Sequence, residues 1–273
     1  MSPQSQGTPQ RQPIPGVKNL IAVGSGKGGV GKTTVSVNLA ISLARQGFKT
    51  GLMDADVYGP NVPLMMGINE APRAIGEKIV PLESYGVRLM SMGFLNPGDK
   101  ALVWRGPRLH GVMNQFLFGV EWGELDYLVI DLPPGTGDVQ LSLIQTAAIT
   151  GAVVVTTPSE VSLEDARKAI DMFEQVRVPI LGIVENMSYF EHPDLKAPVD
   201  LFGRGGGKRT AEAMHVAFLG ELPLDPQIRI GGDTGRPVTT TGKPTAFDEI
   251  VKKVIARTDE VRAAKKTTIT MED

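Results

Sequence analysis

The chain has 273 residues, of which 41% are hydrophobic and 21% charged, and its formal net charge is −2. This length suits one sizeable α/β domain, and the near-neutral charge argues against a protein-wide nucleic-acid surface. No apolar run approaches the ~20 residues of a membrane span, and the absence of cysteine excludes disulfides and thiolate metal sites within the chain.

The first residues, "MSPQSQGTPQRQPIPG", are rich in Pro, Gln and Ser and have no apolar core. This composition is typical of a disordered segment and not of a signal peptide, so we expect a disordered tail over residues 1–17 and a cytoplasmic protein. We expect a single domain over residues 18–264 and a polar C-terminal tail over 265–273, because no composition break or internal repeat divides the chain.

Short apolar runs alternate with helical patterns through the rest of the chain. Runs such as "YLVID" and "AVVVTT" are apolar throughout, which indicates strands buried on both faces, as in a parallel sheet. The expected strands cover residues 19–23, 50–53, 88–93, 127–131, 152–156, 180–184 and 217–221. The expected helices cover residues 32–46, 105–118, 139–148, 163–176 and 244–266. This order predicts an α/β fold, a doubly wound and mostly parallel sheet with helices on both faces.

A glycine-rich loop joins the first strand to the first helix. Its sequence, "GKGGVGKT", fits the P-loop pattern G-x-x-x-x-G-K-S/T, and the strand–loop–helix setting argues against a glycine-rich turn without function. The glycines let the backbone wrap phosphates, with amide hydrogens and the helix N-terminus facing the negative charge. Lys32 would reach the β and γ phosphates, and the Thr33 hydroxyl would bind Mg²⁺. The expected nucleotide-binding residues are Gly26, Lys27, Gly28, Gly29, Val30, Gly31, Lys32, Thr33 and Thr34.

A second lysine, Lys27, lies inside the loop, where the P-loop pattern does not require one. It is either a solvated loop charge or a cation that faces the developing phosphate charge, from across a dimer interface, as an arginine finger does.

Acidic residues end two of the expected strands. Asp54 and Asp56 follow the second strand in "LMDADVYGPN", and Asp131 ends the buried run "YLVID" at a Walker-B position. A lone Asp at a strand end is usually a turn or cap residue. Three of them at the carboxyl edge of the sheet, beside a P-loop, indicate a site that handles metal and water.

Several longer segments resemble a known family. The loop "KGGVGKTT", with its extra lysine, resembles the deviant Walker A motif of the SIMIBI class of P-loop ATPases. Together, "DADVYGPN", "WGELDYLVIDLPPGTGD", "ENMSYF" and "GRGGGKRTAEA" resemble the Mrp/ApbC family of iron–sulfur cluster carrier ATPases over about residues 18–256. The resemblance implies an ATPase that forms a homodimer with ATP near the interface, and protein partners that are iron–sulfur assembly factors or apo-targets.

The resemblance also implies roles for single residues. Lys27 would reach the nucleotide of the second subunit, Asp56 would orient the hydrolytic water, and Asn186 would contact the adenine. The implied catalytic residues are Lys27, Lys32 and Asp56. The implied Mg²⁺ site comprises Thr33, Asp54 and Asp131.

One segment departs from the family pattern. In the family, "SYF" is followed by one variable residue and then Cys-Pro-x-Cys, and these cysteines hold a 4Fe–4S cluster shared across the dimer. Here His192 stands at the first cysteine position and Leu195 at the second. Leucine cannot bind iron, so the family's cysteine-bound cluster is not expected, and His192 is either an iron ligand or an exposed loop histidine.

Two functions therefore remain open. The first is an ATPase of the carrier family that acts in iron–sulfur cluster assembly or transfer without the usual cluster. The alternative is an ATP-gated dimeric switch, similar to MinD or ParA, that positions a protein partner. The C-terminus lacks an amphipathic helix with large apolar residues and no basic stripe stands out, so neither a membrane nor nucleic acid is an expected partner.

Overall fold

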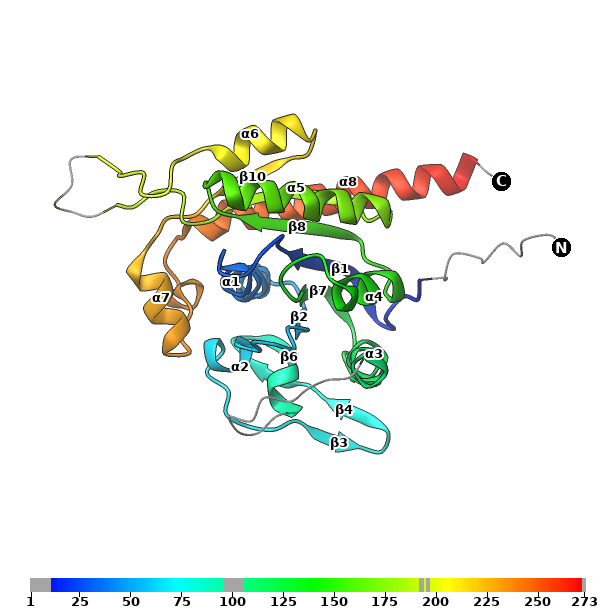
Figure 1. Cartoon of the computed structure of the whole chain (residues 1–273). Helices are drawn as coiled ribbons and strands as arrows, with labels where there is room; N and C mark the ends of the chain where they lie inside the picture. Colours follow the sequence, from blue (N-terminus) through cyan, green and yellow to red (C-terminus); the bar gives the residue numbers. More distant parts are fainter. Residues whose placement is uncertain (1–10, 96–105, 192–193, 195–196, 272–273) are drawn as a thin grey trace.

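The computed structural model describes residues 11–95, 106–191, 194 and 197–271 (Figure 1). An eight-stranded sheet in the order β10-β9-β8-β1-β7-β2-β6-β5 crosses the molecule, and every pair in it is parallel except β5–β6. Its strands are β1 (Val17–Gly24), β2 (Thr50–Asp54), β5 (Leu82–Ser84), β6 (Val87–Ser91), β7 (Leu125–Asp131), β8 (Gly151–Thr156), β9 (Ile180–Glu185) and β10 (Phe218–Glu221).

Helices cover both faces of this sheet. They are α1 (Lys32–Arg45), α2 (Val62–Met65), α3 (Gly106–Asn114), α4 (Asp138–Thr146), α5 (Glu160–Gln175), α6 (Gly206–Ala213), α7 (Pro226–Asp233) and α8 (Ala246–Met271). A π-helical turn, Gln115–Gly119, continues α3, and short 3-10 turns lie at Met92–Leu95 and Val238–Thr241. The predicted doubly wound, mostly parallel sheet is confirmed.

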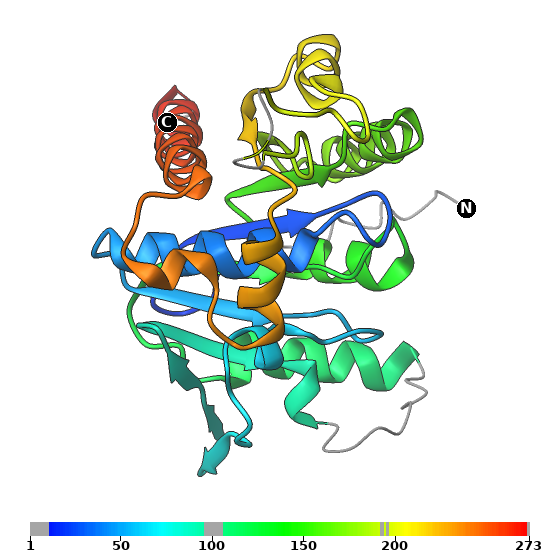
Figure 2. The same cartoon turned by 90° about the vertical axis from the view of Figure 1, so that its left-hand side faces the viewer.

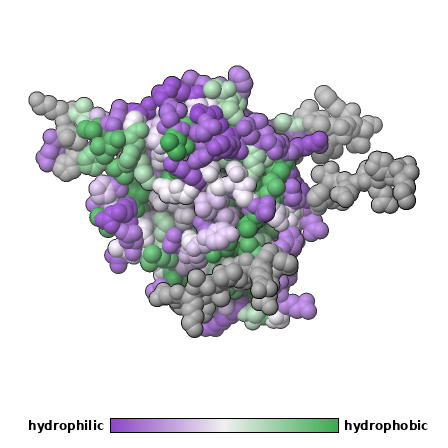
Figure 3. Space-filling model, viewed as in Figure 1, coloured by the Kyte–Doolittle hydropathy of each residue, from purple (hydrophilic) through white to green (hydrophobic). Residues whose placement is uncertain are grey.

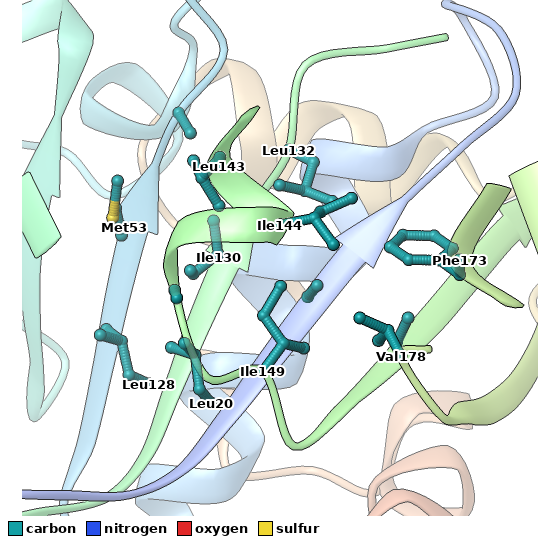
Figure 4. Packing of buried hydrophobic residues seen from close by; sticks show 14 of the residues in the cluster. Leu20, Met53, Leu128, Ile130, Leu132, Leu143, Ile144, Ile149, Phe173 and Val178 are labelled. Atoms are coloured by element: carbon teal, nitrogen blue, oxygen red, sulfur yellow. The ribbon is translucent and has the colours of Figure 1, made fainter. Parts of the chain in front are cut away.

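Alternate residues of the central strand β1 face two separate cores. Leu20 and Ala22 pack on the side of α3, α4 and α5, whereas Ile21 and Val23 pack on the side of α1 and α8. Figure 4 shows the first of these cores, where Leu20 lies near Leu128 and Ile149. Each fully buried large apolar side chain stabilises the fold by roughly 1.5–3 kcal/mol. The loop that follows β1 therefore begins at a strand that is buried on both faces.

The N-terminal segment departs from the expectation of a disordered tail over residues 1–17. Gln12 donates its N–H to the carbonyl of Thr146 at 3.0 Å and accepts from the N–H of Ala148 at 3.0 Å, and Ile14 is buried in the core. These contacts correct the expectation for residues 11–17. The sequence could not show them, because one isolated isoleucine and a backbone bridge leave no periodic pattern. Residues 1–10 lie outside the described residues.

Two further differences concern elements beyond the central sheet. A short antiparallel hairpin, β3 (Arg73–Ile75) and β4 (Lys78–Val80), was not expected, and it extends away from the body of the molecule at the bottom of Figure 1. The terminal helix α8 continues to Met271, through residues that we expected to form a polar tail from 265 onward. None of the described helices is long and apolar enough to cross a membrane.

Candidate functional site: a P-loop and its carboxylates

The glycine-rich loop between β1 and α1 has the backbone conformation that its glycines predict. Gly29 and Gly31 have φ values of 81° and 82°, in the left-handed region that favours glycine. A Cβ on Gly31 would lie 2.1 Å from Nδ2 of Asn186, so a larger residue would also collide with the residue that follows β9. The loop leads directly into α1 at Lys32, which places the positive end of that helix dipole at the loop.

Lys32 lies against a buried carboxylate at the end of β7. Its Nζ is 2.7 Å from Oδ1 of Asp131 and 4.0 Å from Oδ2 of Asp56. The Thr33 hydroxyl donates to Oδ2 of Asp131 at 2.8 Å, and the Ser36 hydroxyl donates to Oδ1 at 2.7 Å. The first turns of α1 therefore supply a cation and two hydroxyls to one carboxylate that has no exposed surface.

Ser36 was not among the residues expected from the sequence. Its spacing offers a signal, since residues four apart lie on the same face of a helix and Ser36 follows Lys32 by four. The Ser36 Oγ also lies 3.1 Å from the carbonyl oxygen of Lys32, a longer contact that shares its single proton with the bond to Asp131. This residue thus belongs to the group that holds Asp131.

Asp54 ends the neighbouring strand β2 and is paired in register with Asp131. Its Oδ2 accepts from the Ser91 hydroxyl at 2.7 Å, and its Oδ1 accepts from the backbone N–H of Asp56 at 3.1 Å. Burial, followed by the charge of Asp131, raises the pKa of Asp54 to about 7, although the hydrogen bond from Ser91 and the charge of Lys32 act in the opposite direction. Asp54 therefore holds the start of the loop that carries Asp56.

Asp56 and Lys32 line the same cavity. Its Oδ1 accepts from the N–H groups of Tyr58 and Gly59, at 3.1 and 3.2 Å, so the carboxylate has a fixed orientation. Its Oδ2 is the oxygen that lies 4.0 Å from Lys32 Nζ. One carboxylate oxygen is thus held by the loop while the other points toward the P-loop lysine.

A cavity of about 800 Å³ opens over the P-loop and over Asp56. Asn186 and Met187, which follow β9, line another part of it, and Leu224 and Ile228 add apolar surface from the segment around α7. Figures 1 and 2 show α7, in orange, lying beside α2. The sequence did not predict α7, although Asp225 before Pro226 is a helix-start signal, and Asp225 does accept from the N–H of Gln227.

The structure places the remaining expected residues as follows. Asn186 is buried at this cavity and donates from Nδ2 to the carbonyl of Val30 at 2.8 Å, so it contacts the P-loop itself. Lys27 is half-buried and lines the cavity, and no carboxylate of the described residues pairs with it.

His192 lies outside the described residues. The described part of the chain holds no group of three or more His, Asp or Glu side chains that could bind a metal ion.

Comparisons with known proteins identify the family of the chain. A family model described as NUBPL iron-transfer P-loop NTPase, of the ParA type, matches residues 16–258. An iron–sulfur cluster carrier protein of Deinococcus radiodurans is 54% identical over 247 residues, which is 90% of this chain and 70% of that protein. An iron–sulfur protein required for NADH dehydrogenase, from Arabidopsis thaliana mitochondria, is 48% identical over 253 residues, 90% of this chain and 81% of that protein.

Solved structures with the same fold are also similar. A nucleotide-binding protein of Archaeoglobus fulgidus in complex with ADP has a TM-score of 0.75 and 40% identity, and the match covers 85% of this chain and 91% of that one. The cell division ATPase MinD of Pyrococcus furiosus has a TM-score of 0.64 at 22% identity, covering 87% and 98%, and this likeness shows the fold alone. The chain thus belongs to the NUBPL iron-transfer family of P-loop NTPases, together with proteins named as iron–sulfur cluster carriers.

Proposed function

We propose that this protein binds and hydrolyses ATP with Mg²⁺ as a homodimer, and that it acts in the assembly or transfer of iron–sulfur clusters. The observation that carries the proposal is the position of Lys32, which lines the cavity together with Asp56 and pairs with the buried Asp131. An iron–sulfur cluster is the cargo in this proposal. Because the chain has no cysteine, the thiolates that hold the cargo belong to a protein partner.

The residues present suit a magnesium ion. Thr33 Oγ1 and Asp131 Oδ2 lie 2.8 Å apart at the start of α1, and hydroxyl and carboxylate oxygens are the ligands that Mg²⁺ prefers beside substrate phosphates. Both residues would hold the ion, and Asp54 would support them from the adjacent strand. When bound, the ion would supply positive charge to the phosphate oxygens.

The side chains would then divide the chemistry of hydrolysis. The loop amides and the start of α1 would bind the phosphates, and Lys32 would exchange part of its contact with Asp131 for phosphate oxygens. The oxygen of Asp56 that faces Lys32 would orient the attacking water for in-line displacement. Asn186 lines the cavity with its Nδ2 bound to the P-loop, and it would contact the adenine, as the resemblance implies.

The surface around the cavity supports a dimer. Tyr58 and Leu64 both line the cavity, yet their side chains are 80% and 56% exposed. Large apolar side chains at a polar site favour coverage by another protein surface. A second copy that covers them would bring its Lys27 near this nucleotide, as the resemblance implies.

The segment between β9 and α6 supports a protein partner. Val199, Leu201 and Phe202 of this segment are exposed, and Figure 3 shows a hydrophobic area in green at the upper left, over this part of the molecule. The alternative function, an ATP-gated switch that positions a partner without any cluster, is favoured by one observation, the absence of cysteine. Both functions need the same ATP chemistry.

The deciding experiment measures cluster transfer. A cysteine-containing carrier loaded with a 4Fe–4S cluster is mixed with an apo-enzyme that gains activity when it receives the cluster, with and without this protein and MgATP. We expect ATP-dependent acceleration of transfer together with phosphate release. Phosphate release without acceleration would support the switch, and no phosphate release would overturn both functions.

A further inference from the structure

A buried carboxylate that the ATP chemistry does not use lies at the end of β9. Glu185 has no exposed surface. Its Oε1 accepts from the Ser188 hydroxyl and from the backbone N–H of Gly205 at 2.9 Å, and its Oε2 accepts from the N–H of Gly207. The last two donors belong to the start of α6, where the helix dipole is positive. Since a buried carboxylate is costly unless it is hydrogen-bonded, this set of three donors fixes Glu185 firmly.

Two residues that line the cavity, Asn186 and Met187, stand between Glu185 and Ser188 in the sequence. We call residues 185–188 the 185–188 turn. Met187 has a φ of 56°, an uncommon backbone conformation for a residue other than glycine. The bond from Ser188 to Glu185 closes the turn across this residue, and the N–H of Ser188 donates to the carbonyl of Leu222 at 2.9 Å. The Glu185 carboxylate is therefore one of the groups that hold the turn in the conformation that Met187 adopts, together with the backbone bond of Ser188.

The 185–188 turn also touches the P-loop. Asn186 donates to the carbonyl of Val30 at 2.8 Å. A Cβ on Gly31 would lie 2.1 Å from Nδ2 of Asn186 and 3.8 Å from Cε of Met187, so both side chains lie directly over this glycine. A displacement of the turn would therefore change the packing of the phosphate-binding loop.

We infer that Glu185 is a positioning residue for nucleotide binding: it holds the 185–188 turn so that Asn186 and Met187 line the cavity and support the P-loop. This inference rests on the proposed function, because it requires a nucleotide in that cavity. Glu185 acts through its neighbours and does not touch the nucleotide. Lys32 and Asp56 lie on other elements, so loss of Glu185 weakens binding and leaves the chemical step intact.

The test uses the full chain and three variants. The Glu185→Gln change places an amide NH2 against backbone N–H donors, and Ser188→Ala removes only the bond that closes the turn. Glu221→Gln is the matched control, since Glu221 occupies the register position of Glu185 on β10 but pairs with Arg204 near the surface. Calorimetry with Mg²⁺ and adenosine 5′-(β,γ-imido)triphosphate gives Kd, and phosphate release from ATP gives KM and kcat.

We expect Glu185→Gln to raise Kd and KM about tenfold, Ser188→Ala about threefold, and Glu221→Gln less than twofold, with kcat unchanged within about twofold in all three. Variants of Glu185 and Ser188 that melt earlier but bind nucleotide as tightly as the wild type would overturn the inference, because Glu185 would then be merely structural. So would a fall in kcat at unchanged KM. If Glu185→Gln does not fold, the Kd and KM of Ser188→Ala test the inference. A wild-type protein that binds no nucleotide would instead overturn the proposed function.

Discussion

Lys32 holds Asp131 at 2.7 Å inside the protein, so a nucleotide that binds Lys32 competes with an ion pair that already exists. The Lys32→Ala change removes the cation and leaves the buried carboxylate with the hydroxyls of Thr33 and Ser36. We expect the affinity for ATP to fall at least ~100-fold. The free energy of unfolding should fall by about 3 kcal/mol, since an unpaired buried charge remains. Titration calorimetry and urea unfolding measure the two effects separately.

Lys27 should behave differently from Lys32, because it has no carboxylate partner within the described ranges and lies at the rim of the same cavity. We expect Lys27→Ala to keep the Kd for ATP within about threefold and to lose most of the turnover, as removal of a charge that acts in the transition state does. The comparison needs Kd and the rate of phosphate release on the same preparation. Equal rates for this variant and the wild type would exclude a catalytic role for Lys27.

Gln140 presents a buried amide without a partner. The residue is 1% exposed, and no described group forms a hydrogen bond with its Nε2 or Oε1. Its Nε2 would lie 3.3 Å from a Cβ on Gly24, at the point where β1 leads to the P-loop. Replacing the amide by an apolar group of similar shape, in Gln140→Met, removes an unpaired polar group from the core.

We expect Gln140→Met to raise Tm by roughly 2–6 °C in differential scanning calorimetry. The matched control is Gln145→Met on the same helix, where the side chain is exposed and the change should shift Tm by less than about 1 °C. An equal or lower Tm for Gln140→Met would show that its amide is satisfied in solution.

At the scale of elements, Asp126 ties together the starts of three strands. Its Oδ1 accepts from Lys18 Nζ at 2.8 Å and its Oδ2 from the N–H of Lys49 at 2.9 Å, while its carbonyl accepts from Asn19 Nδ2. The hydrogen bond from Lys18, followed by that from Lys49, holds the pKa of Asp126 below its usual value. A carboxylate whose pKa is lower in the folded state stabilises the fold above its unfolded pKa, and this contribution is lost as the pH falls through the folded pKa.

Asp126→Asn should therefore destabilise the protein at neutral pH, by about 1 kcal/mol or less because Asp126 is partly exposed. The difference from the wild type should stay constant down to about pH 5 and narrow below about pH 4, where the aspartate protonates. Urea unfolding between about pH 3 and pH 7 measures this difference in the free energy of unfolding. The control is Asp171→Asn, because Asp171 is exposed. A difference that grows on acidification would contradict the assigned sign.

The elements that the sequence predicted well are those with a long, unambiguous pattern. The run "YLVID" became β7 (Leu125–Asp131), and the P-loop lies between a strand and a helix as its spacing requires. The hairpin of β3 and β4 escaped prediction because strands of three exposed or half-buried residues show no periodicity. The bonds of Glu185 escaped it as well, since they join residues about 20 positions apart in the chain and depend on how α6 meets β9.

At the scale of the whole molecule, the proposed dimer would determine which subunit completes each site. Suppose that Lys27 acts on the nucleotide of the other subunit. A Lys27→Ala subunit then keeps its own Lys32 and can bind a nucleotide, but it cannot supply Lys27 to the site of the other subunit. A Lys32→Ala subunit has lost its own P-loop lysine and can still provide Lys27. Each variant alone should be inactive, whereas a mixed dimer contains one complete site.

Mixing the two inactive variants in equal amounts should thus restore activity. If the subunits exchange freely, half of the dimers are mixed and each has one of its two sites complete, so the mixture should reach about a quarter of the wild-type rate. The control replaces the Lys32→Ala protein by a double variant that also lacks Lys27, and no rate should return. An inactive first mixture, with mixed dimers demonstrated by mass spectrometry, would mean that Lys27 acts within its own subunit. A catalytic site shared between subunits would then no longer explain why Tyr58 and Leu64 are exposed.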